Sequence, residues 1–143
     1  MAFDIDQDAL ADAKENVSFY ECEDKVELVQ IDLVEAGELP TQFDTIIMNP
    51  PFGTSNAGVD MKLLSVAVNS LKAGGQLFSL HKLKLNKPQM TKTFITKYVA
   101  EHHSDSTLEF LFDFEFSLPQ TYKHHKKKEA TTPVCILRIV KGG

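Results

Sequence analysis

The 143-residue sequence predicts an α/β fold built around a parallel sheet. An apolar run at 43–48 is typical of a buried parallel strand. It ends at Asn49-Pro50-Pro51, where two prolines disfavour continuation as a strand or entry into a helix. Around this run, segments with strand patterns alternate with segments that have helical periodicity, as expected of a parallel sheet. The C-terminal part adds a pair of strands that we expect to be antiparallel.

The first third of the chain predicts two strands and one helix. Residues 1–5 have the composition of a strand end, and 26–31 form the next predicted strand. Between them, apolar side chains recur at helical spacing over 7–21, and Asp6 stands where an N-cap is expected. Residues 35–42 contain a glycine and a proline and are predicted to form a loop.

The middle of the chain predicts a second helix and another strand. Asp60 is the expected N-cap of a helix whose apolar side chains share one face, and Ala73-Gly74-Gly75 is the expected stop. A short strand is predicted at 76–80. Residues 54–60, which contain Gly58, are expected to form a flexible lip beside the end of the strand at 43–48.

The last third predicts a helix and two strands. Pro88 is suited to the first turn of a helix that runs to about His103, and we expect Phe94 and Tyr98 to pack in the core. Residues 108–116 alternate strongly, so we expect one face to carry Leu108, Phe110, Phe112, Phe114 and Phe116, with Glu109, Asp113 and Glu115 opposite. The final predicted strand, 134–140, is expected to run antiparallel to this one.

Composition indicates one soluble globular domain, with 43% hydrophobic and 24% charged residues. We find no apolar run long enough to span a membrane and no signal peptide. The two cysteines, Cys22 and Cys135, do not have metal-ligand spacing, so free thiols in a reducing compartment are expected.

Charge is distributed unevenly along the chain. Residues 1–60 hold 14 acidic and 2 basic side chains, whereas 72–128 hold 10 lysines and 5 acidic side chains. This asymmetry fits a nucleic-acid-binding protein with one non-binding face, and it is also a common accident of surface composition.

The Asn49-Pro50-Pro51-Phe52 turn is suited to methylation of a planar nitrogen. The lone pair of such a nitrogen is delocalised, so positioning matters more than a strong base. The Asn49 side-chain oxygen and the Pro50 carbonyl can each accept a hydrogen bond from an NH2 group and thereby orient its lone pair. Phe52 offers a face on which a flipped-out base could stack. The alternative is an ordinary proline turn after a strand.

An Asn-Pro-Pro-Phe turn after an apolar strand resembles the signature of AdoMet-dependent amino-methyltransferases, which include adenine-N6, cytosine-N4 and glutamine-N5 enzymes. Within this group the chain resembles the methyltransferase-like 5 family, N6-adenosine methyltransferases of small-subunit ribosomal RNA. Four segments carry the resemblance, in the order of that family: 3–6, 47–54, 79–82 and 118–128. The resemblance implies a class I (Rossmann-like) AdoMet methyltransferase fold and a single methyltransferase domain over 1–143.

The resemblance also assigns roles to residues. The catalytic residues would be Asn49, Pro50, Pro51 and Phe52. The cofactor S-adenosyl-L-methionine (AdoMet) would be bound by four residues: Asp4 at the ribose hydroxyls, Asp32 at the adenine amine, Leu33 against the adenine ring, and Asn49. A carboxylate facing a vicinal diol is chemically sound, although an acidic residue at a strand end is also a frequent surface feature.

The connection at 118–132 is long for a hairpin and rich in lysine. An aromatic side chain among cations suits a phosphate backbone with one stacked base, and the alternative is a solvated charge run. With the resemblance, RNA binding is expected at Tyr122, Lys123, Lys126, Lys127 and Lys128. We expect no metal site, because adjacent histidines such as His124 and His125 rarely converge on one ion.

The sequence departs from the family at its start. Such an enzyme needs a first strand and a Gly-rich turn before the segment at 3–6, so we expect an N-terminally truncated, C-terminal portion of the domain. The parent activity would be methylation of an rRNA adenosine. The alternatives are an inactive RNA- or partner-binding module and a glutamine-N5 protein methyltransferase. The family also implies an intracellular location, in the nucleus or cytoplasm, and a small activator subunit, which we expect at the edge of strand 26–31.

Overall fold

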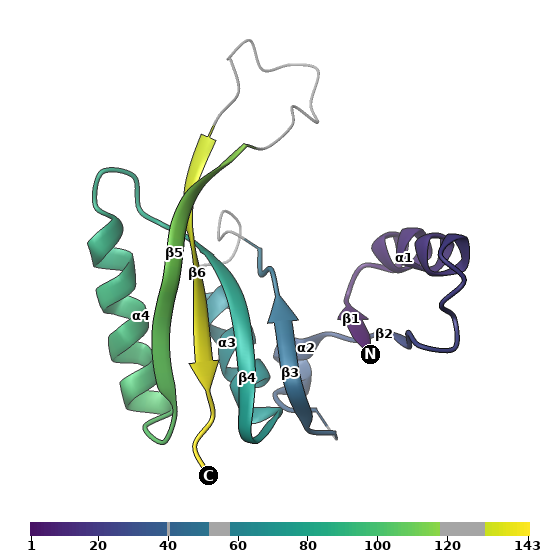
Figure 1. Ribbon diagram of the computed structural model, residues 1–143, viewed down its shortest axis with the longest axis horizontal. Coiled ribbons are helices and arrows are strands. Elements are labelled where there is room, and N and C mark those ends of the chain that lie inside the picture. The colour runs from purple at the N-terminus through teal and green to yellow at the C-terminus, as the bar shows by residue number, and fades with distance from the viewer. Residues whose placement is uncertain (40, 52–57, 118–130) are drawn as a thin grey trace. The chain divides into compact units, whose positions relative to one another are not determined.

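The computed structural model describes residues 1–39, 41–51, 58–117 and 131–143. The chain forms two compact units, Met1–Pro40 and Thr41–Gly143, and each is described by itself (Figure 1). In the described part of the chain, no helix is both long and apolar enough to cross a membrane. Both cysteines are free thiols, as predicted.

The first unit is a parallel strand pair with two helices. Its elements are β1 (Ala2–Asp4), α1 (Gln7–Phe19), β2 (Leu28–Gln30) and α2 (Leu33–Ala36). In the β1–β2 pair, Asp4 lies opposite Gln30. The Asp6 side chain accepts hydrogen bonds from the amides of Asp8 and Ala9, which confirms it as the N-cap of α1. None of the described residues of this unit is fully buried.

Part of the predicted loop at 35–42 is helical instead. The short helix α2 forms because one carboxylate oxygen of Asp32 accepts hydrogen bonds from the amides of Val34, at 2.9 Å, and Glu35, at 3.2 Å. These contacts satisfy two of the amides that a helix start leaves unpaired.

The second unit is a four-stranded sheet with two helices. Its elements are β3 (Phe43–Met48), α3 (Val59–Asn69), β4 (Leu71–Lys82), α4 (Pro88–His102), β5 (Thr107–Ser117) and β6 (Thr131–Val140). The strand order is β3-β4-β6-β5. Strands β3 and β4 are parallel, and β6 is antiparallel to both β4 and β5. The predicted strand at 43–48 and the predicted antiparallel pair are therefore confirmed.

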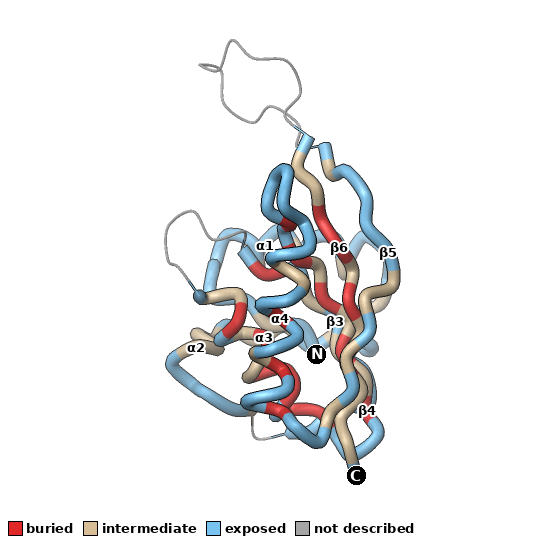
Figure 2. Tube along the Cα trace, turned by 90° about the vertical axis from the view of Figure 1, so that its left-hand side faces the viewer, coloured by how far each residue is buried: buried red, intermediate tan, exposed pale blue. Residues whose placement is uncertain are grey.

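The core of this unit lies between the sheet and its two helices. Most buried residues of this unit lie in α3, β4 and β6, with two more in α4 (Figure 2). The cluster consists of Met61, Leu64, Ala67, Val68, Leu71, Leu77, Ile95, Val99, Leu137 and Ile139. Half-buried Tyr98 packs against this cluster, as predicted. Phe94 is 58% exposed, so its prediction as a core residue was wrong, because Ile95 and Val99 occupy the inner side of α4.

The predicted single apolar face of 108–116 is also wrong. Leu108 and Phe110 pack against the core, whereas Phe112 is 57% exposed and Phe114 is 37% exposed. The pairing with β6 shifts register between Phe110 and Phe112. A bulge places one extra residue, Leu111, in the strand, and one extra residue reverses the alternation of all side chains beyond it.

The boundaries of α3 differ from those predicted. The N-cap is Gly58 rather than Asp60, and the helix ends at Asn69, before the predicted stop at 73–75. Those three residues lie in β4, where the pairing with β3 shifts register. Gly74 there has a φ of +76°, a conformation that favours glycine.

Candidate functional site

The turn after β3 lies at an edge that several elements share. Met48, the last residue of β3, pairs with Ser79 of β4, so the carboxyl ends of these parallel strands lie side by side. Ligands bind at such ends in open α/β sheets. Strand β5 ends at this edge and β6 begins there, because Ser117 pairs with Thr131 and Lys82 pairs with Val134. We call this edge of the sheet the C-terminal edge.

The predicted catalytic residues begin directly after β3. Asn49 is exposed, and its side chain has no hydrogen-bond partner among the residues that the structure describes. Pro50 is buried and Pro51 is exposed. A buried proline fixes its own φ and is held by its surroundings, so the backbone next to the free Asn49 amide is restrained. Phe52 lies outside the described residues.

Two buried polar side chains of β4 and a half-buried carboxylate of α3 lie next to one another at this edge. His81 Nε2 lies 2.8 Å from Ser79 Oγ, and each of these two residues of β4 is at most 2% exposed. His81 Nδ1 lies 3.9 Å from a carboxylate oxygen of Asp60 in the first turn of α3. This distance is longer than that of an ordinary hydrogen bond. The His81 imidazole holds the pKa of Asp60 below its ordinary value of 3.8.

The contacts from Ser79 to His81 and from His81 to Asp60 link the end of β4 to the start of α3. Ser79 and His81 belong to the resembling segment 79–82, but the sequence predicted no role for either residue. The available signal was two polar side chains, two residues apart, in an apolar strand. Side chains at that spacing point to the same face of a strand, so two polar groups on a buried face need each other as partners.

The predicted cofactor-binding carboxylates lie together in the first unit. Asp4 ends β1, and its backbone oxygen accepts a hydrogen bond of 2.9 Å from the amide of Ile31, the residue before Asp32. Asp4 and Asp32 therefore lie at the ends of adjacent parallel strands. Leu33, also a predicted cofactor residue, is half-buried in the first position of α2.

These carboxylates fit the groups of an adenosine. In Asp4, Oδ1 accepts the amide of Asp6 at 2.9 Å, and in Asp32, Oδ1 accepts the two amides that begin α2. No described residue donates to Oδ2 of either residue, so each side chain is oriented by one oxygen and has the other available. Hydroxyl and amine groups donate hydrogen bonds, and an available carboxylate oxygen can accept them.

The remaining predicted site residues are those expected to bind RNA and an activator subunit. The expected RNA-binding residues Tyr122, Lys123, Lys126, Lys127 and Lys128, and the two adjacent histidines, lie outside the described residues. The described strands β5 and β6 show that this connection begins and ends at the C-terminal edge. The strand expected to bind an activator, 26–31, is the short strand β2. Within the described ranges, no group of three or more metal-ligating side chains occurs.

Comparison with known proteins identifies relatives over nearly the whole chain. The model of the methyltransferase small domain matches residues 1–106. The rRNA N(6)-adenosine-methyltransferase metl-5 of Caenorhabditis elegans is 34% identical over 144 residues, covering 99% of this chain and 64% of that protein. The corresponding METTL5 protein of Danio rerio is 36% identical over 141 residues, covering 97% of this chain and 63% of that protein. The chain thus spans less than two thirds of the length of these relatives.

Solved structures show the same fold. A candidate RNA methyltransferase from Pyrococcus horikoshii matches with a TM-score of 0.76 at 25% identity, covering 99% of this chain and 62% of that chain. A methyltransferase homologue from the same organism matches with a TM-score of 0.64 at 21% identity, covering 98% of this chain and 52% of that chain. The predicted class I methyltransferase fold is therefore confirmed. With the match over residues 1–106, these findings show that the chain belongs to the methyltransferase small domain family.

Proposed function

We propose that this chain carries the catalytic turn of an AdoMet-dependent methyltransferase that acts on the N6 amine of an adenosine in small-subunit ribosomal RNA. The observation that carries the proposal is the exposed Asn49 amide, without a described partner, beside buried Pro50 at the end of β3. The names of the curated relatives, which are rRNA N6-adenosine methyltransferases, support the choice of substrate. Residues 1–143 would form part of one methyltransferase domain.

The turn would act by orienting the adenine amine. The Asn49 side-chain oxygen and the Pro50 carbonyl accept its two hydrogens, so the nitrogen lone pair is directed outward. The amine nitrogen would then form a bond to the methyl carbon that the cofactor supplies, the sulfur would keep the electron pair of the broken sulfur–carbon bond, and the methylated nitrogen would release one proton to water. Phe52 and Pro51 complete the turn, with Phe52 stacking on the base. AdoMet, when bound, supplies the electrophilic methyl group.

Residues of the first unit would hold the cofactor. The Oδ2 atoms of Asp4 and Asp32 are available for the ribose hydroxyls and the adenine amine, respectively. Leu33 would lie against the adenine ring.

Partners follow from the same proposal. Tyr122, Lys123, Lys126, Lys127 and Lys128 would bind the RNA backbone and stack one base. A small activator subunit would add to the edge of β2, within 26–31. The location would be inside the cell, in the nucleus or cytoplasm, where this RNA is made and used.

Methyl transfer to two substrates tests the proposal. The chain is incubated with AdoMet labelled on its methyl group and with either protein-free small-subunit rRNA or a release-factor-like protein that carries an accessible glutamine. We expect label in the RNA, recovered as N6-methyladenosine after digestion to nucleosides. Label in the protein instead would establish the glutamine-N5 alternative. RNA binding without transfer to either substrate would establish the inactive module.

A further inference from the structure

We propose that α4 and the connection leading into it form a second RNA-binding surface, which binds single-stranded RNA beside the methylated adenosine. This lysine stripe consists of Lys84, Lys87, Met90, Phe94 and Lys97. The inference rests on the proposed function for the identity of the RNA. It differs from the expected RNA contact at 118–132, since it lies on another connection of the sheet and on a helix.

Charge is the first observation. Residues 61–100 contain seven lysines and no acidic side chain. Two of these lysines are neutralised by partners on the sheet: Lys72 pairs with Asp44 at 2.8 Å, and Lys92 pairs with Asp113 at 2.7 Å. The three lysines of the stripe are exposed and form no ion pair within the described part of the chain. Their charge is therefore available to an anionic partner.

Helical spacing gathers the stripe on one face. Lys87 is the N-cap of α4, and Met90, Phe94 and Lys97 follow at intervals of three or four residues. Residues at these intervals lie on the same side of a helix. Ile95 and Val99, which are buried, occupy the opposite side.

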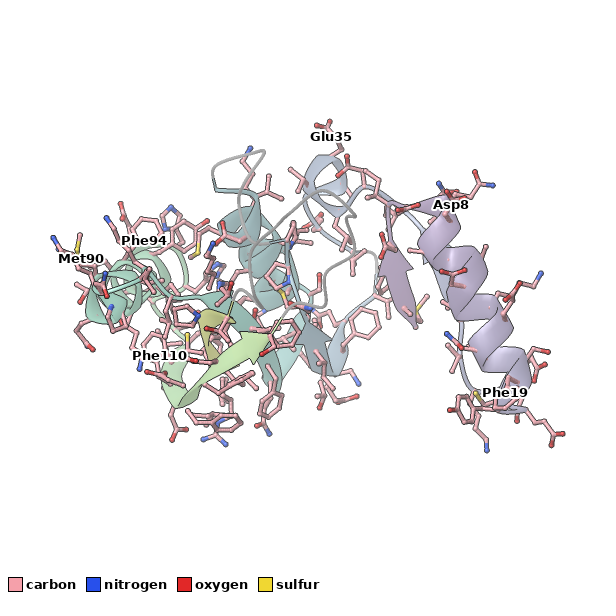
Figure 3. All side chains as sticks on the ribbon, turned by 90° about the horizontal axis from the view of Figure 1, so that it is seen from above. Asp8, Phe19, Glu35, Met90, Phe94 and Phe110 are labelled. Atoms are coloured by element: carbon pink, nitrogen blue, oxygen red, sulfur yellow. The ribbon has the colours of Figure 1, made fainter. Side chains whose placement is uncertain are left out.

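Two large apolar side chains stand exposed within the stripe. Met90 is 54% exposed and Phe94 is 58% exposed. Figure 3 shows both on the side of α4 away from Phe110, which packs against the core. The Phe94 ring has one contact with another ring in the described chain, a tilted approach to Tyr98 at 6.5 Å between centroids. More than half of Phe94 is thus accessible, on the same side of α4 as Lys87 and Lys97.

The lysine stripe begins near the catalytic turn. Strand β4 continues three residues, or about 10 Å, from Ser79 to its end at Lys82. Since Ser79 pairs with Met48, the connection to α4 starts at the C-terminal edge, close to Asn49. Lys84 and Lys87 lie in that connection, and α4 then leads away along one face of the sheet (Figure 1). An RNA strand leaving the turn would meet these lysines first and Phe94 next.

Single-stranded RNA is the partner that matches all of these features. Lysines bind phosphates as point charges, and an exposed ring stacks on any base. Spaced lysines around one aromatic ring therefore fit a flexible polyanion with planar bases. An acidic protein would bind the same lysines, and the experiments below distinguish it from RNA.

RNA binding measured without AdoMet tests the surface. A labelled single-stranded oligoribonucleotide carrying the adenosine is titrated with the chain over a series of salt concentrations, and anisotropy is recorded. Lys87→Gln/Lys97→Gln is compared with Lys14→Gln/Lys25→Gln, which removes two exposed lysines from the first unit. We expect the stripe variant to weaken binding and to reduce the salt slope by about 1.4, at roughly 0.7 per lost phosphate contact, and the control to bind as the wild type.

The aromatic contribution is tested in the same assay. Phe94→Leu is expected to weaken binding roughly fivefold or more, with the salt slope unchanged, because stacking is lost and charge is not. Phe19→Leu, at another exposed ring, is the matched control. Circular dichroism verifies that every variant is folded.

Three outcomes would overturn the inference. One is equal weakening by the stripe and control lysine pairs, which would mean diffuse electrostatic attraction. The second is wild-type affinity for the stripe variant or an absence of RNA binding by the wild type. The third is displacement of the RNA by polyglutamate with no effect of Phe94→Leu, which would indicate an acidic protein partner. Methyl transfer plays no part in this measurement, so failure of the proposed function would appear separately.

Discussion

Nε2 of His81 lies 2.8 Å from Oγ of Ser79, and both side chains are buried two residues apart in β4. Ser79 pairs with Met48, the residue before the Asn49 turn, so this hydrogen bond lies in the strand that flanks the turn. The Asp60 contact ties the same imidazole to the start of α3. The buried face of β4 thus contains a polar pair whose members satisfy each other.

A double-mutant cycle will measure this pair. Ser79→Ala leaves a buried ring nitrogen without a partner and should lower the free energy of unfolding by about 1–3 kcal/mol. In Ser79→Ala/His81→Leu both partners are apolar, so the combined loss should be smaller than the sum of the two single losses. Chemical denaturation gives all four values. Ser104→Ala, at an exposed position, is the control and should change little. Additive losses would show that the two side chains are not coupled.

His103 predicts a pH dependence of stability. Its ring is 7% exposed, and Nε2 lies 2.9 Å from Ser65 Oγ. Burial lowers the pKa of His103 below its ordinary value of 6.5, and the nearby His102 and Lys141 lower this pKa further, whereas Asp105 raises it. The unfolded chain therefore binds a proton at a higher pH than the folded chain does. We expect the free energy of unfolding to decrease as the pH falls below about 6.5, until the folded pKa is passed.

Two histidine variants isolate this contribution. His103→Gln should be less stable than the wild type at pH 8 because it disturbs a buried contact, and its stability should decrease less between pH 7 and pH 5. His102→Gln removes one of the neighbours that lower the His103 pKa, so its slope should lie between those of the wild type and of His103→Gln. Thermal unfolding at several pH values provides the comparison. The same slope in wild type and His103→Gln would assign the pH dependence to other groups.

The sequence predicted elements whose signals are local. The strand at 43–48 was predicted to the residue, and Pro88 opens α4 as predicted, because an apolar run and a proline act on their own backbone. The bulge at Leu111 was missed because alternation alone does not show which residues pair across strands. The start of β4 was missed for the same reason. The pairing of β4 with β3 shifts register, so β4 includes Gly74 and Gly75, which in the sequence resemble the end of a helix.

The candidate site was predictable in part. Asn49 and Pro50 follow directly from the end of a strand, and the adjacency of Asp4 and Asp32 follows from two predicted parallel strands. The contact from His81 to Asp60 joins side chains 21 positions apart, on β4 and α3, and no local pattern encodes that proximity. The lysine stripe required knowledge of which face of α4 packs on the sheet, since the sequence predicted that Phe94 would be buried.

The backbone around Gly75 leaves no room for a side chain at this position of β4. A Cβ atom at this position would lie 2.9 Å from the backbone oxygens of both Lys72 and Phe43. Backbone atoms at a strand pair cannot move aside without disturbing the pairing, so Gly75→Ala should lower the free energy of unfolding by about 1–3 kcal/mol. Gly143→Ala, where a Cβ would meet nothing within 4 Å, is the control. Wild-type stability of Gly75→Ala in chemical denaturation would show that the register shift between β3 and β4 can relax.

Asn49→Ala separates catalysis from folding and from cofactor binding. The Asn49 side chain is exposed and has no hydrogen-bond partner among the described residues, so its removal should leave the free energy of unfolding nearly unchanged. Under the proposed function it accepts one of the two hydrogens of the adenine amine. Its loss should reduce methyl transfer to rRNA by at least about 100-fold, as for loss of one preorganised hydrogen-bonding group in other active sites. Calorimetric titration should still detect AdoMet binding.

Asn16→Ala, on the exposed surface of α1, should retain wild-type transfer. If Asn49→Ala abolished AdoMet binding or unfolded the chain, the residue would be structural, and the orientation of the amine would have to come from other groups.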